Sequence, residues 1–69
     1  MLKIKDNVDL KELVKLGFKP DKRKNVLYSI TDELFGDVVV VWEDKRVSFY
    51  DFSDGIRFKM MTENIIEQC

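Results

Sequence analysis

Residues 37–52 read DVVVVWEDKRVSFYDF, and this stretch decides most of the predicted fold. Residues 38–42 are β-branched and aromatic, which is the composition of a well-buried strand. Residues 43–46 are polar, and residues 47–52 alternate between apolar and polar side chains. This pattern predicts a β-hairpin.

The register of this hairpin determines which side chains share a face of the sheet. A turn at Asp44-Lys45 would place Val40 opposite Phe49, with Val39 and Val41 on the other face. That second face is half apolar, although an antiparallel sheet usually presents a polar face to water. Either a short C-terminal helix covers it, or it is exposed as an interface. The residues expected at this candidate protein interface are Leu27, Val39, Val41, Tyr50 and Phe52.

A helix before the hairpin is marked at both ends. Asp9 can cap its start, because a carboxylate accepts hydrogen bonds from free backbone N–H groups. Gly17 can end it in the left-handed conformation, after which Phe18 folds back on Leu13 as in a Schellman motif. These signals predict a helix at residues 9–16.

The remaining segments complete an α+β prediction. Residues 19–25 form a charged turn containing proline, whereas residues 26–31 and 56–60 alternate as strands do. Thr62 can cap a short final helix. We therefore expect residues 1–69 to form a single two-layer domain, in which the N-terminal helix packs on a three- to four-stranded antiparallel β-meander and a short C-terminal helix follows.

The composition argues against catalysis. The chain has no histidine, its three glycines are isolated, and its single cysteine is Cys69. Zinc sites of the usual kinds, His-based acid–base chemistry and phosphate-cradling loops are therefore not expected. We predict a non-enzymatic protein with no catalytic, cofactor-binding or metal-binding residues. The lack of a possible intrachain disulfide and of a long apolar segment favours a cytoplasmic location without membrane contact.

The basic residues offer an alternative function. Residues 1–24 hold eight basic and four acidic side chains, whereas residues 25–69 hold four basic and nine acidic ones. The cations of the first turn could contact phosphates, although no aromatic residues lie between them to stack on bases. The candidate nucleic-acid contacts are Lys19, Lys22, Arg23 and Lys24.

The opening MLKIKDNVDLKEL at residues 1–13, continued by Gly17-Phe18-Lys19, resembles small uncharacterised proteins of phages and prophages of Gram-positive bacteria. The resemblance covers about the first quarter of the chain. It implies an accessory protein in the bacterial host cytoplasm that acts by protein–protein binding, including as an inhibitor of a host defence factor. The expected partner is a host or phage protein or a second copy of the chain, rather than a small-molecule substrate.

Overall fold

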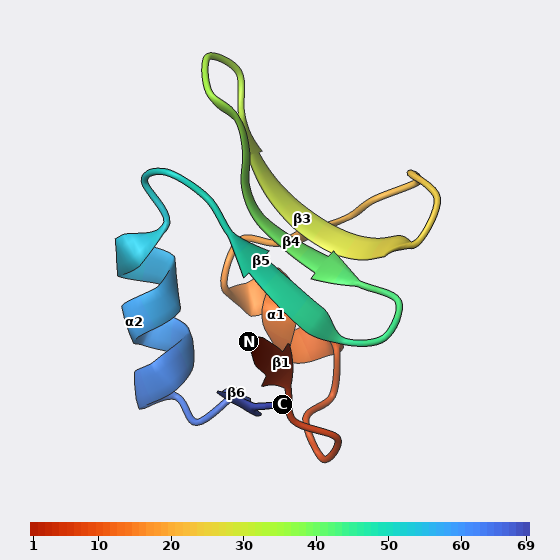
Figure 1. Cartoon of the computed structure of the whole chain (residues 1–69), viewed down its shortest axis with the longest axis vertical. Coiled ribbons are helices and arrows are strands. Elements are labelled where there is room, and N and C mark those ends of the chain that lie inside the picture. Colours follow the sequence, from red (N-terminus) through yellow and green to blue (C-terminus); the bar gives the residue numbers. More distant parts are fainter.

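A six-stranded antiparallel sheet forms most of the structure, which is a computed structural model of residues 1–69 (Figure 1). Two short helices accompany the sheet. In chain order, the elements are β1 (Leu2–Ile4), α1 (Lys11–Lys15), β2 (Lys19–Pro20), β3 (Val26–Asp32), β4 (Gly36–Trp42), β5 (Arg46–Phe49), α2 (Asp54–Thr62) and β6 (Ile66–Gln68). The strand order in the sheet is β2-β3-β4-β5-β1-β6.

The two ends of the chain lie side by side in this sheet (Figure 1). β1 lies between β5 and β6, so Lys3 is opposite Arg46 on one side and Glu67 on the other. The backbone N–H of Cys69 also donates to the carbonyl of Met1 at 2.9 Å. These contacts join segments that are far apart in the sequence.

The expected fold class is wrong. The chain is not a helix on a three- to four-stranded meander, because β1, β2 and β6 extend the sheet to six strands. The longer helix, α2, lies in the C-terminal part of the chain, where residues 56–60 were expected to form a strand. β6 occupies the segment expected to be a final helix, because β1 supplies it with a partner strand.

The alternation of residues 56–60 does not reflect a strand. Within α2 only Met60 is fully buried, Ile56 is half-buried one turn earlier, and Phe58 is exposed. The spacing of Ile56 and Met60, four residues apart, is the helical one. The exposure of Phe58 made the pattern look like a period of two.

α1 is shorter than predicted, but its C-terminal end has the expected geometry. Gly17 has a φ of 101°. The Phe18 N–H donates to the Leu13 carbonyl, and the Gly17 N–H donates to the Val14 carbonyl, both at 3.1 Å. These two bonds define a Schellman motif, and both Leu13 and Phe18 are buried. At the start, the Asp9 carboxylate accepts a hydrogen bond from the Lys11 N–H at 2.9 Å.

The β4–β5 hairpin differs from its predicted register by one residue. Val39 lies opposite Phe49 and Val41 opposite Val47. The connection has three residues rather than two, because Lys45 takes a left-handed conformation with a φ of 73°. A shift of one residue exchanges the two faces of a strand. Val39 and Val41 consequently face the core.

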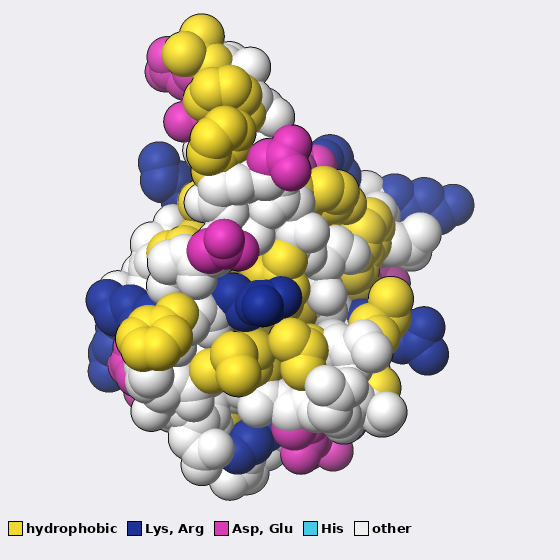
Figure 2. Space-filling view, turned by 60° about the vertical axis from the view of Figure 1, so that its left-hand side comes forward, with side chains coloured by type: hydrophobic (Ala, Val, Ile, Leu, Met, Phe, Trp, Pro, Cys, Tyr) yellow, Lys and Arg dark blue, Asp and Glu magenta, His cyan; other side chains and the backbone are white.

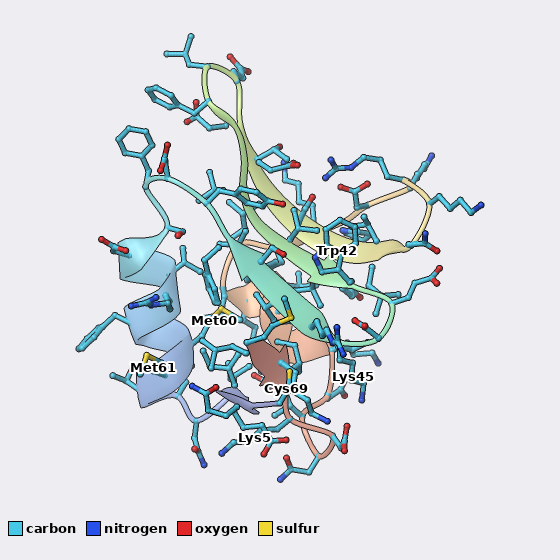
Figure 3. All side chains as sticks on the ribbon, viewed as in Figure 1. Lys5, Trp42, Lys45, Met60, Met61 and Cys69 are labelled. Atoms are coloured by element: carbon cyan, nitrogen blue, oxygen red, sulfur yellow. The ribbon has the colours of Figure 1, made fainter.

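The core joins the sheet to both helices. Met60 of α2 lies on the sheet side of its helix, whereas Met61 points away from it (Figure 3). The C-terminal residues Ile65 and Ile66 also pack in this cluster. The buried cluster consists of Ile4, Leu13, Leu16, Phe18, Val38, Val39, Val41, Val47, Met60, Ile65 and Ile66.

Candidate functional site

An exposed apolar surface lies where the β3–β4 hairpin meets the loop between β5 and α2. Figure 1 shows this hairpin projecting from the body of the protein, and Figure 2 shows hydrophobic side chains along the projection. We call this surface the tip patch, formed by Leu34, Phe35, Tyr50 and Phe52. Contiguous exposed apolar side chains of this kind on a small domain mark interaction sites.

Phe35 and Phe52 form the centre of the tip patch. Their ring centroids are 4.5 Å apart, and the ring planes are inclined at 38°. The two residues nevertheless remain 60% and 71% exposed. The pair therefore joins two loops without being removed from water, and its outer faces are free for a partner.

The hairpin tip is held by its own turn residues. The Asp32 carboxylate accepts hydrogen bonds from the Leu34 N–H at 2.8 Å and from the Phe35 N–H at 3.1 Å. Gly36 follows with a φ of 76°, which suits glycine and returns the chain to β4. The exposed Leu34 and Phe35 are thus presented by a hydrogen-bonded turn.

The opposite loop holds Phe52 in an unusual backbone conformation. Its φ of 67° lies in the left-handed region, which costs a bulky L-residue about 1 kcal/mol or more. Burial of the ring does not offset this cost, since Phe52 is exposed. Next to it, the buried Ser53 donates its hydroxyl hydrogen to the Tyr50 carbonyl and fixes the loop. Strain of this kind is typical of functional positions.

A shallow hollow adjoins the aromatic pair. Its volume is about 620 Å³, and Phe35, Phe49, Tyr50 and Phe52 line it together with Asp37 and Asp51. An apolar side chain of a partner could enter there beside Asp51, whereas Asp37 is already paired with Arg23.

The predicted interface is only partly accessible. Tyr50 and Phe52 lie in the tip patch, but Val39 and Val41 are fully buried, and their expected place on a free face is wrong. The three-residue connection shifts the hairpin register by one residue, so Val39 and Val41 pack with Ile65, Ile66 and the rest of the core. The chain's own C-terminal part therefore covers that face. Leu27, at a register shift of β3, is half-buried.

Sequence reasoning missed Leu34 and Phe35. Residues 32–36 connect the two predicted strands at residues 26–31 and 38–42, and two consecutive large apolar residues at the centre of this connection were the available signal. Loops of this length are usually polar or rich in glycine. A pair of large apolar side chains there has no core to enter.

The basic turn is partly neutralised within the chain. Arg23 donates two hydrogen bonds to Asp37, at 3.0 and 2.9 Å, and also contacts Asp21 at 2.8 Å. The Ser29 hydroxyl donates to Asp21 at 2.7 Å. The bonds from Arg23 and Ser29 hold the pKa of Asp21 below its ordinary range, and the two carboxylates raise the pKa of Arg23. Lys19, Lys22 and Lys24 are exposed, but Arg23 is engaged.

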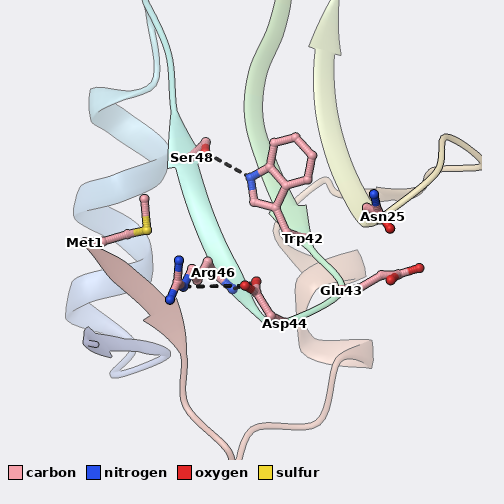
Figure 4. A pocket seen from close by; sticks show the side chains of 7 residues that line it. All are labelled: Met1, Asn25, Trp42, Glu43, Asp44, Arg46 and Ser48. Atoms are coloured by element: carbon pink, nitrogen blue, oxygen red, sulfur yellow. Dashed lines mark hydrogen bonds and ion pairs between the residues drawn. The ribbon is translucent and has the colours of Figure 1, made fainter.

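A second hollow, of about 490 Å³, lies beside Trp42 (Figure 4). The indole N–H of Trp42 donates to the Ser48 hydroxyl at 2.9 Å, and Arg46 pairs with Asp44 at 3.4 Å. Glu43, Asn25 and Met1 complete the lining. The indole N–H and the Arg46 charge thus already have partners within the chain.

Other kinds of site find no support in the fold. No three His, Cys, Asp or Glu side chains come together where they could hold a metal ion. Neither helix combines the length and the apolar composition needed to span a membrane. Comparison of the chain with protein-family models, curated proteins and solved structures gives no match. The tip patch is the strongest candidate site, because it joins exposed apolar side chains from two loops.

Proposed function

We propose that this chain is a non-enzymatic binding protein that docks another protein through the tip patch. The observation that carries the proposal is the Phe35–Phe52 pair, which is packed ring to ring and yet mostly exposed. Unlike the single exposed Phe58, Phe35 and Phe52 lie together in one exposed apolar patch, and such patches mark interaction sites.

The size of the patch suits the centre of an interface. An aromatic side chain buries roughly 150–250 Å² when fully covered, so covering these four residues removes about 400 Å² from water. At about 25 cal/mol per Å² this gives roughly 10 kcal/mol before the costs of association, which are of similar size. Binding therefore needs further contacts around the patch, and the aromatic pair acts as its hot spot.

The resemblance of residues 1–19 to phage and prophage proteins supports a bacterial host factor as the first partner to test. A phage accessory protein that covers a host defence protein with this patch would act as its inhibitor. The nucleic-acid alternative has less support, because Arg23 of the basic turn is paired with two carboxylates.

Site-specific photo-cross-linking tests the proposal. Benzoylphenylalanine replaces Phe35 in one variant and Phe58 in another, and each is irradiated in a Gram-positive bacterial extract. Phe58 is the matched control, because it is also an exposed phenylalanine but lies on α2 outside the patch. We expect a discrete adduct from position 35 that is absent at position 58 and is lost when F52S is added.

The same adduct from both positions, or none from position 35, would refute the proposal. An adduct of twice the chain's mass would identify a second copy as the partner. Circular dichroism of F52S controls for loss of fold.

A further inference from the structure

The two segments that carry the tip patch are acidic. Residues 32–37 and 50–54, which form the hairpin tip and the facing loop, contain neither lysine nor arginine. Figure 2 shows acidic side chains beside the hydrophobic projection. The carboxylates of these two segments are Asp32, Glu33, Asp37, Asp51 and Asp54.

Most of these charges are not compensated within the chain. Asp37 is neutralised by Arg23, at 2.9 Å. The Asp32 carboxylate accepts hydrogen bonds from backbone N–H groups but forms no ion pair. Glu33, Asp51 and Asp54 are exposed and form no ion pair within the protein. Glu33 and Asp51 therefore lie beside the aromatic pair without a charged partner within the chain.

We infer that the partner of the tip patch is a basic protein surface, with lysines or arginines around an apolar or aromatic side chain. This inference rests on the proposed function and specifies the partner's chemistry. Cations opposite Glu33 and Asp51 would give complementary potentials across the interface, which increase specificity and the association rate. An arginine could also stack on the exposed rings of Phe35 or Phe52.

The same charges disfavour the other occupants. A symmetric dimer through the tip would bring each set of carboxylates against its copy, and like charges in contact oppose association. A nucleic acid would meet the carboxylates with its own phosphates. An uncharged partner would remove water from Asp51 and Glu33 without supplying counter-charges.

Two peptides serve as probes of this chemistry. One is an amphipathic peptide of arginine, leucine and tryptophan, and the other has glutamate in place of every arginine. Each is titrated into the full ¹⁵N-labelled chain while amide shifts are followed. We expect the basic peptide to shift amides of residues 32–37 and 50–54, and the acidic peptide to shift none of them.

Charge variants provide the quantitative test. E33Q/D51N removes two charges at the tip, whereas E43Q/E63Q removes two exposed, unpaired charges elsewhere. We expect E33Q/D51N to weaken binding of the basic peptide by about 2- to 30-fold, and E43Q/E63Q to leave it within twofold. Equal weakening by both variants, or equal binding of both peptides, would overturn the inference.

The inference and the proposed function can fail separately. If a cross-linked partner depends on Phe35 and Phe52 but binds E33Q/D51N as tightly as the original chain, only the basic character of the partner is refuted. If F35S/F52S has no effect on either the partner or the peptide, the tip patch itself is not the docking surface.

Discussion

Two alanine substitutions in α2 discriminate directly between a helix and a strand at residues 54–62. Met60 is fully buried, whereas Phe58 is 69% exposed. In a strand these two residues would share a face and be buried together. We therefore expect M60A to destabilise the protein strongly and F58A to change its stability little.

The magnitudes follow from burial. Truncation of a fully buried methionine to alanine costs about 2–5 kcal/mol, from lost transfer energy and the cavity left behind. An exposed side chain contributes about 0.5 kcal/mol or less, and alanine has the higher helix propensity. A chain of this length has a free energy of unfolding of roughly 3–10 kcal/mol, so M60A loses a large part of it.

Urea unfolding followed by the fluorescence of the single tryptophan, Trp42, measures both effects. With a urea dependence of about 1 kcal/mol per M, M60A should lower the midpoint by 2 M or more, or unfold the chain without urea. F58A should stay within about 0.5 M of the original midpoint. If F58A costs as much as M60A, the segment is a strand and the helix is refuted.

Two further predictions concern backbone conformation and pH. G17A should destabilise the protein by about 1–2 kcal/mol, because Gly17 has a φ of 101°. G55A should stabilise it by up to about 1 kcal/mol, because Gly55 lies within α2 and alanine has the higher helix propensity. Urea midpoints that move in the same direction for both variants would contradict this. D21N should be less stable than the original chain at pH 7, because Arg23 and Ser29 hold the pKa of Asp21 well below its ordinary 3.8. A carboxylate with a lowered pKa stabilises the fold above the unfolded pKa and loses this effect as pH falls toward the folded pKa. The original chain should therefore exceed D21N in unfolding free energy by the full amount at neutral pH, and this difference should shrink below about pH 4. A difference that stays constant down to acidic pH would contradict a stabilising Asp21–Arg23 pair.

Local signals in the sequence were sufficient for some elements. The end of α1 was predictable because glycine and the apolar pair Leu13 and Phe18 specify a Schellman motif within six residues. β3 and β4 were predictable because their side chains suit a half-buried or buried strand. In these segments the conformation is determined by residues close in sequence.

Long-range pairing was not predictable in the same way. β1 and β6 are three residues each and come from opposite ends of the chain, so neither carries a strand signal of its own. They pair with each other, and β1 also pairs with β5. The segment of α2 was predicted as a strand because Ile56, Phe58 and Met60 are apolar at every second position. Phe58 is on the solvent-exposed side of the helix, so this alternation does not reflect burial.

The candidate site was half predictable for a related reason. Tyr50 and Phe52 follow β5 and were named as interface candidates, and both are exposed. Val39 and Val41 were predicted on the wrong face. A glycine in the turn would have indicated a left-handed residue, but nothing in the sequence indicates that Lys45 adopts this conformation and lengthens the turn by one residue. Phe35 became important only when the fold brought its ring to within 4.5 Å of Phe52.

Calorimetric titration of the purified partner into three forms of the chain tests the docking surface most directly. The forms are the original chain, F35S/F52S and F58S. We predict that F35S/F52S weakens the dissociation constant at least 30-fold, as loss of a hot spot does, and that F58S leaves it within twofold. Equal affinity of all three forms, or a loss confined to F58S, would show that the protein binds through another surface.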